Sequence, residues 1–112
     1  MTSVTQQYQE YILDLLAPLA PQPRRMFSGV GLFHRSVMFG LLVRDALYLR
    51  VDERSRVKFE DAGSRPFTYD RAGRTARLTA YYEVPEELLD QPEQLLVWAR
   101  DAIAVALAAK RR

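Results

Sequence analysis

Residues 24–33 read Arg-Arg-Met-Phe-Ser-Gly-Val-Gly-Leu-Phe, and they mark where the chain turns from helix to sheet. Two arginines lead into a short apolar run that holds two glycines, Gly29 and Gly31. This composition predicts a β-strand over residues 26–33. Glycine within a strand marks a bulge or a close backbone crossing, whereas a phosphate-binding loop would open a helix and carry a Gly-x-x-x-x-Gly-Lys pattern.

Two further apolar runs, residues 37–43 and 46–51, follow after turn-sized polar connections. In the second run Leu47, Leu49 and Val51 alternate with Tyr48 and Arg50. Short connections join antiparallel strands, so the three runs predict a β-meander.

Amphipathic helices are predicted at both ends of the chain. Ser3 and Gln6 form a capping box at the start of the first helix, which covers residues 3–17 and ends at Pro18 and Pro21. Its apolar face holds Tyr8, Tyr11, Ile12, Leu15, Leu16 and Leu19.

The last helix begins with a capping box of Asp90 and Glu93, after a first helical turn at residues 85–87. Its apolar face holds Leu95, Trp98, Ala99, Ala102, Ile103 and Ala106.

Between the meander and the last helix, Asp52 is placed to cap a short helix over residues 53–62, and Gly63 to end it. A second hairpin pairs residues 65–69 with residues 76–84 around a loop at 70–74. The order is therefore α-βββ-α-ββ-α. We expect an α+β fold, with an antiparallel sheet and the long N- and C-terminal helices packed on it.

The bulk properties indicate one cytoplasmic domain over residues 1–112. The chain has 112 residues, 48% of them hydrophobic, and no cysteine. No apolar run approaches the roughly 20 residues of a membrane helix, and the N-terminus does not resemble a signal peptide.

The chain resembles the N-terminal domain of the TfoX/Sxy family through landmarks that occur in order. The opening Arg-x-Met-Phe is followed by glycines, with Ser28 in the first glycine place. Further landmarks are segments 38–41 and 46–52, the segment 63–69, a Tyr-Tyr-x-x-Pro pattern at 81–85 and a tryptophan in the last helix. The motif positions are Arg25, Met26, Phe27, Gly29, Gly31, Gly63, Phe67, Tyr81, Tyr82, Pro85 and Trp98.

The resemblance implies a regulatory function. Founding members of the family regulate competence genes, in some bacteria as co-activators beside a cyclic-AMP-responsive transcription factor, and they carry an additional C-terminal helical domain. We therefore expect a non-catalytic interaction domain in bacterial gene regulation, with a protein partner such as a transcription factor. No cofactor and no membrane contact are expected.

The residue pattern offers no catalytic or metal-binding motif. His34 is the single histidine, and a metal site needs further ligands beside it. Ser28 and Ser36 have no general base at a readable spacing. An enzyme or small-ligand protein remains a third alternative, and it predicts a deep polar pocket.

Arginine dominates the basic side chains and raises a second hypothesis, direct nucleic-acid binding through the 65–77 hairpin. The net charge is +2, and Lys58 and Lys110 are the lysines. The alternative explanations are codon usage in a genome rich in G and C, which favours arginine over lysine, and a solvated hairpin whose charge Asp70 and Glu83 partly neutralise. The candidate nucleic-acid or anion contacts are Arg24, Arg25, Arg65, Arg71, Arg74 and Arg77.

Two expectations concern surfaces. Tyr81 and Tyr82 point to opposite faces of a strand, so one should lie in the core and the other on the surface or in an interface. Pro66 should protect an edge strand at residues 65–69, whereas residues 26–33, if they lie at an edge, offer a route to a homodimer.

Overall fold

The computed structural model describes residues 4–26 and 29–111. The elements follow the expected class, with one strand more than the sequence predicted. In chain order they are α1 (Gln6–Leu15), η1 (Ala17–Leu19), β1 (Gln22–Met26), β2 (Gly29–His34), β3 (Val37–Val43), β4 (Ala46–Arg50), α2 (Arg56–Asp61), β5 (Pro66–Arg71), β6 (Arg74–Glu83), η2 (Glu86–Asp90) and α3 (Pro92–Lys110).

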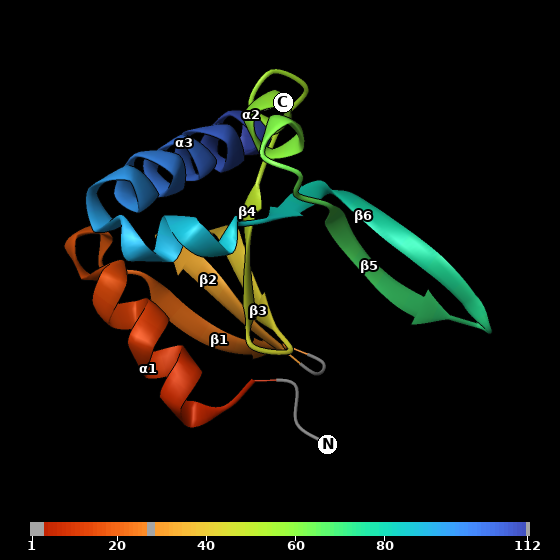
Figure 1. Ribbon diagram of the computed structural model, residues 1–112, viewed down its shortest axis with the longest axis horizontal. Helices are drawn as coiled ribbons and strands as arrows, with labels where there is room; N and C mark the ends of the chain where they lie inside the picture. The colour runs from red at the N-terminus through yellow and green to blue at the C-terminus, as the bar shows by residue number, and fades with distance from the viewer. Residues whose placement is uncertain (1–3, 27–28, 112) are drawn as a thin grey trace.

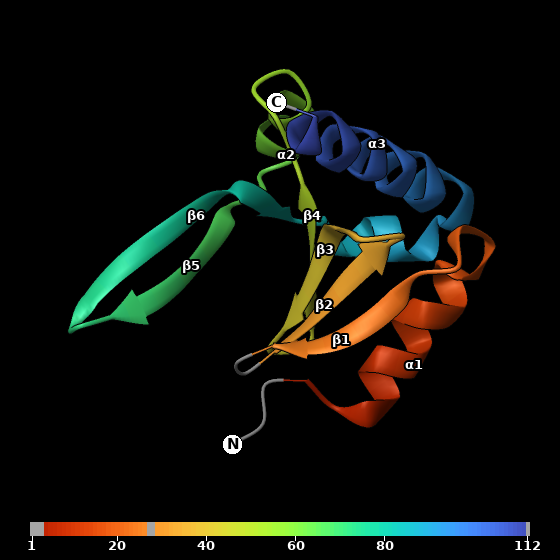
Figure 2. The same cartoon turned by 180° about the vertical axis from the view of Figure 1, so that it is seen from behind.

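The strands form one antiparallel sheet in the order β1-β2-β3-β4-β6-β5. Helices α1 and α3 cover one face of this sheet, which confirms the predicted packing of the terminal helices (Figure 1). We call the other side the open face. The β5–β6 hairpin, which we call the arm, projects away from the helices and the rest of the sheet (Figure 2).

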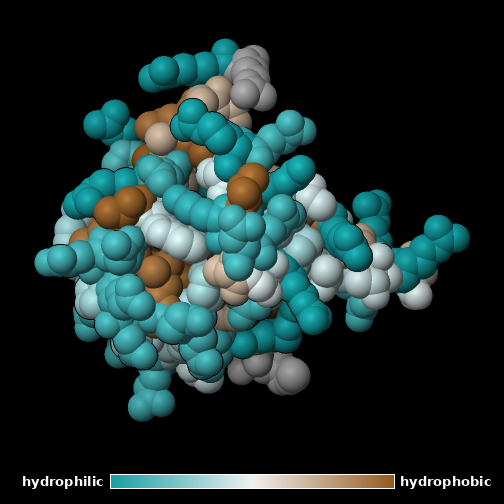
Figure 3. Space-filling model, turned by 45° about the horizontal axis from the view of Figure 1, so that its top comes forward, coloured by the Kyte–Doolittle hydropathy of each residue, from teal (hydrophilic) through white to brown (hydrophobic). Residues whose placement is uncertain are grey.

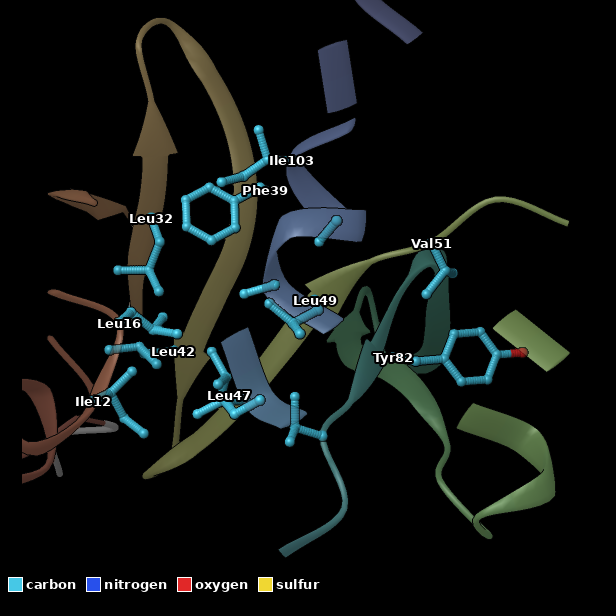
Figure 4. Close-up of a cluster of buried hydrophobic side chains, with 14 of the residues drawn as sticks. Ile12, Leu16, Leu32, Phe39, Leu42, Leu47, Leu49, Val51, Tyr82 and Ile103 are labelled. Atoms are coloured by element: carbon cyan, nitrogen blue, oxygen red, sulfur yellow. The ribbon is translucent and has the colours of Figure 1, made fainter. Parts of the chain in front are cut away.

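The main core lies between the helices and the sheet. Ile12 and Leu16 come from the α1 end, Leu32 and Leu42 from the central strands, and Ile103 from α3 (Figure 4). These side chains are at most 8% exposed. Their burial stabilises the fold, because each fully buried aliphatic side chain contributes roughly 1.5–3 kcal/mol.

A second, smaller cluster lies on the open face. Leu41, Val43, Tyr48 and Tyr81 are buried there. Tyr82, the neighbour of Tyr81, packs in the main core instead. The two tyrosines do point to opposite faces as expected, but the prediction that one of them lies on the surface is wrong, since Tyr81 is 4% exposed.

The strand predicted over residues 26–33 is confirmed from Gly29 onward, as β2, but its predicted start at Met26 is wrong. Met26 pairs with Gly29, so the chain reverses between them and forms the β1–β2 hairpin. Phe27 and Ser28, which belong to the quoted motif, lie outside the described residues. β1 was missed because Pro23 and two arginines resemble a connection, yet an edge strand tolerates proline.

The sheet order also removes the basis for a homodimer through residues 26–33. β2 lies between β1 and β3, so its backbone groups are already paired. The edges are β1, which contains Pro23, and β5, which begins at Pro66. The expected protection of the 65–69 edge by Pro66 agrees with this arrangement.

The N-terminal cap of α1 differs from its prediction. The Thr5 hydroxyl caps the helix by accepting a 3.1 Å hydrogen bond from the Tyr8 N–H, and Ser3 lies outside the described residues. At α3, Gln91 occupies the cap position with Pro92 in the first turn, so the predicted Asp90–Glu93 capping box is wrong.

The short helix begins later than predicted, because α2 starts at Arg56 with Ser55 in the cap position instead of Asp52. Asp52 lies in the preceding turn, where its carboxylate accepts a 2.7 Å bond from the Ser55 N–H and the Ser55 hydroxyl accepts a 2.9 Å bond from the Asp52 N–H. The bond from the Ser55 N–H lowers the pKa of the Asp52 carboxyl. Gly63 follows the helix at a φ of 84°, which suits the predicted stop position.

Among the described helices, none combines the length and the apolar character needed to cross a bilayer.

Candidate functional site

A groove of about 480 Å³ lies between the arm and the open face of the sheet. Met26 on β1 and Tyr69 on β5 both line it, although these strands form opposite edges of the sheet. The sheet therefore curves around its open face and brings the two edges toward each other. The lining residues are Met26, Gly29, Met38, Leu41, Val43, Phe67, Tyr69, Asp70 and Leu78.

Two glycines of the quoted motif shape the floor of the groove. A Cβ on Gly31 would lie 2.6 Å from Met26 Sδ and 2.9 Å from both Met38 Sδ and Phe33 Cε1. The absent side chain thus leaves room for two thioethers to converge over the strand. A Cβ on Gly29 would lie 2.5 Å from the Leu42 carbonyl oxygen, so glycine permits a close backbone approach there, as the sequence predicted.

The arm presents an apolar side to the groove. Phe67 pairs with Leu78 and Tyr69 with Ala76 across the two strands, and paired residues share a face. The register shifts after Pro66, which lets Ala80 and Tyr81 both join the open-face cluster. Such irregularities bend a strand, and here the bend coincides with the point where the arm leaves the sheet.

Tyr69 and Leu78 remain 37% and 38% exposed. They form an exposed apolar surface on the arm. An isolated two-stranded hairpin is only marginally stable in water, so contacts made by this surface would stabilise the arm.

Aromatic side chains anchor the arm to the open face. The Phe67 ring meets the Tyr48 ring edge-on, with ring centroids 5.2 Å apart. The Tyr81 hydroxyl donates a 3.2 Å hydrogen bond to the Met38 carbonyl oxygen. Burial raises the pKa values of both Tyr48 and Tyr81, so both phenols are neutral at physiological pH.

Arg50 lies beside Tyr81, with its guanidinium carbon 5.7 Å from the ring centroid. Its Nε atom is buried and has no hydrogen-bond partner among the described residues.

The six candidate arginines do not form one patch. Strand alternation places Arg71 and Arg74, which pair with each other, on the groove side of the arm tip and Arg77 on the opposite side. Arg24 is on the open face, 4.3 Å over the Phe33 ring, whereas Arg25 points to the other face of β1. Arg65 precedes β5, and its carbonyl oxygen accepts a bond from the Glu83 N–H.

Hydrophilic side chains gather at the tip of the arm, which stands out from the body of the molecule (Figure 3). Within residues 4–26 and 29–111, the ion pairs join Arg56 to Glu60 and Lys58 to Asp101. None of the six candidate arginines takes part in these ion pairs.

A separate polar cluster on the helix side is structural. The Tyr82 hydroxyl donates a 2.7 Å bond to Glu60, and this bond raises the pKa of Tyr82. Lys58 Nζ lies 4.8 Å from the centroid of the Trp98 ring and 2.7 Å from Asp101. Trp98 itself packs against Phe59 at the border of the main core.

The described residues bring together no group of three potential metal ligands. His34 is the last residue of β2 and is half-buried. Sequence reasoning identified Met26, Gly29 and Phe67 as motif positions but missed Met38, Leu41 and Leu78 as groove residues. The alternation of Leu78 with Arg77 and Thr79 was a signal for one apolar side of the arm.

Comparisons with known proteins agree with the motif resemblance. The family described as "TfoX N-terminal domain" matches residues 14–106. A protein named "DNA transformation protein TfoX1" from Aliivibrio fischeri is 32% identical over 80 residues, which cover 71% of this chain and 38% of that protein. "DNA transformation protein TfoX" from Haemophilus influenzae is 30% identical over 67 residues, which cover 59% of this chain and 31% of that protein. The chain thus spans less than two fifths of the length of these relatives.

Proposed function

Because this chain belongs to the TfoX N-terminal domain family, we propose that it is a non-catalytic interaction domain acting through protein contacts in bacterial gene regulation. The names of its relatives concern DNA transformation, so the control of genes for DNA uptake is the proposed setting. The apolar groove beside the arm is the observation that carries this proposal. A concave apolar surface of this kind is typical of sites that bind another molecule.

The chemistry of the groove favours binding over catalysis. Its floor consists of thioether and aliphatic side chains from Met26, Met38, Leu41 and Val43. An enzyme or small-ligand protein was expected to have a deep polar pocket, and this apolar groove argues against that alternative. Methionine side chains adapt their shape to different apolar partners, which suits a protein contact.

Deletion of the gene in its source bacterium tests the proposal. We expect altered transcript levels for DNA-uptake genes and a lower frequency of transformation by added DNA. Both should return with the wild-type gene but not with a Leu78→Asp variant, because this change places a charge in the groove without disturbing the buried core. Unchanged transcripts and unchanged transformation in the deletion strain would contradict the proposal.

Direct nucleic-acid binding is a second candidate function, supported by Arg71, Arg74 and Arg77 on a projecting arm. A phosphate-driven complex weakens steeply as salt rises. Fluorescence anisotropy with labelled duplex and single-stranded DNA at low salt tests it. The triple Arg→Ala variant should lose the signal, with Arg100→Ala on α3 as the matched control. Absence of binding at micromolar protein concentrations excludes this candidate.

A further inference from the structure

The groove combines an apolar floor with arginines at two of its borders. Arg24 lies on the open face near Met26, because residues two apart on a strand share a face. Arg71 and Arg74 continue the groove side of the arm beyond Tyr69. Arg24, Arg71 and Arg74 are all exposed, and the two ion pairs of the described chain involve other residues.

Acidic side chains on this side are fewer. Asp70 lines the groove, and Glu83 pairs with Tyr48 in the sheet, which places it on the open face. Arg44 and Arg50 add positive charge near Tyr48 and Tyr81. The carboxylate of Asp45 is directed to α1, where it accepts two hydrogen bonds from Thr5. The surroundings of the groove are therefore net positive.

This charge distribution argues against a second copy of the chain as the occupant. A two-fold symmetric contact brings the same surface of each copy together. Such a contact through the groove would bring the surface that carries Arg24, Arg71 and Arg74 against the same positively charged surface of the other copy. Like charges in contact cost several kcal/mol, so the groove favours a partner of opposite charge.

The floor argues against nucleic acid as its occupant. Single-stranded nucleic acid binds to exposed aromatic rings and to donors that follow the backbone. Here the partly exposed side chains of the floor are the thioethers Met26 and Met38, and the Tyr48 and Tyr81 rings are buried beneath the arm. Among the aromatic residues that line the groove, Tyr69 on the arm is exposed, which gives one stacking ring rather than a row of them. Bulky apolar side chains of a peptide fit such a floor, and flexible methionines can adjust to them.

We propose that the groove between the arm and the open face binds an acidic peptide segment of a partner protein, with bulky apolar side chains on the floor and carboxylates against Arg24, Arg71 and Arg74. This inference rests on the proposed function as a protein-contact domain. It adds the chemical class of the partner and the place where it binds.

Selection from a library of random linear peptides displayed on phage, against the immobilised full chain, tests the inference. We expect enriched sequences to combine bulky apolar residues with a net negative charge. A synthetic copy of an enriched peptide should shift the amide resonances of Gly29, Gly31, Leu41 and Leu78 in the ¹⁵N-labelled chain. No enrichment, enrichment of basic sequences, or shifts confined to the helix side would each overturn the inference.

Variants separate the two components of binding. Leu78→Asp should weaken the selected peptide by about tenfold or more, as truncation of a central contact does. Val97→Asp, the same kind of change at a 48% exposed position on α3, should leave affinity unchanged. The double change Arg71→Ala and Arg74→Ala should lower affinity and reduce its dependence on salt, whereas Arg100→Ala should not.

Two further measurements cover the other occupants. Binding of single-stranded DNA that competes with the peptide would assign the groove to nucleic acid and overturn the inference. A mass that doubles with concentration in light scattering, and reverts in the Leu78→Asp variant, would assign it to a second copy. The gene deletion is independent of these results, so the proposed function and this inference can fail separately.

Discussion

The hydroxyl group of Tyr81 crosses the open face and donates a 3.2 Å hydrogen bond to the carbonyl oxygen of Met38, a residue 43 positions earlier in the chain. Tyr81 lies where β6 leaves the sheet to form the arm, and Met38 lies on β3 in the floor of the groove. One side chain therefore connects the base of the arm with the groove floor.

Replacement of Tyr81 by phenylalanine should lower the free energy of unfolding by about 1 kcal/mol, since it removes one half-buried hydrogen bond and keeps the ring. Urea unfolding monitored by circular dichroism measures the change. Tyr11→Phe is the matched control, because Tyr11 is 43% exposed and such surface changes usually stay within about 0.5 kcal/mol. Equal stabilities for the two variants would show that the Tyr81 bond contributes nothing.

The two floor glycines should respond differently to alanine. In Gly29→Ala the new Cβ meets the Leu42 carbonyl oxygen at 2.5 Å, and the backbone must move. In Gly31→Ala the nearest atoms are the ends of Met26, Met38 and Phe33, which can rotate away. We expect Gly29→Ala to cost about 3 kcal/mol or more and Gly31→Ala about 1 kcal/mol, within the usual range for overpacking.

Thermal and urea unfolding of both glycine variants measure which of them loses more stability. Gly31→Ala should in addition weaken the selected peptide, because the methionines are displaced into the groove. A larger loss of stability in Gly31→Ala than in Gly29→Ala would contradict the described floor.

The turn at the tip of the arm can be improved. Ala72 and Gly73 both have positive φ angles, 53° and 78°, as a two-residue hairpin turn requires. Alanine is strained there by roughly 1 kcal/mol, whereas asparagine adopts this conformation readily. Ala72→Asn should therefore slow hydrogen exchange of the arm amides, and Ala72→Val should accelerate it. The reverse order would show that the turn has another geometry.

Alkaline pH should destabilise the fold through its tyrosines. Burial and then the Asp45 carboxylate raise the pKa of Tyr8 to about 12, above the value of 10.0 for a free tyrosine. The folded state therefore holds the Tyr8 proton more tightly than the unfolded state. The corresponding stabilisation is complete below pH 10 and is lost as pH rises from about 10 to about 12.

Urea midpoints measured between pH 8 and pH 12 test this expectation. Burial also raises the pKa values of Tyr48 and Tyr81, so the loss should exceed that from Tyr8 alone. Tyr8→Phe should show a smaller decrease of the midpoint than the wild type over the same range. A midpoint independent of pH in the wild type would be inconsistent with these environments.

The sequence predicted the elements in which periodicity and local chemistry agree. The strand at 37–43 was placed correctly because it is a continuous apolar run between turns. The short helix after the meander was also expected, although its predicted cap at Asp52 lies three residues before the observed cap position, Ser55. β1 could not be recognised, since Pro23 and its arginines are acceptable only at the edge of a sheet, and that position is set by tertiary pairing.

The groove could not be predicted from the sequence either, because it too depends on how distant strands are arranged. Met26 and Tyr69 line it together only because the sheet curves and brings opposite edges toward each other. The motif drew attention to Gly31, yet the neighbours that explain it include Met38 on another strand. Alternation indicated that Tyr81 and Tyr82 point to opposite faces, but not that Tyr81 is buried in the open-face cluster.

Proline at both sheet edges also bears on how the protein behaves at high concentration. Pro23 lies within β1 and Pro66 begins β5, so each outer strand lacks a backbone donor. A strand from another molecule therefore has an incomplete template on either side, and fibril growth by strand addition is hindered. We expect the purified chain to remain free of amyloid-type fibres, and a Pro23→Val variant to be more prone to them.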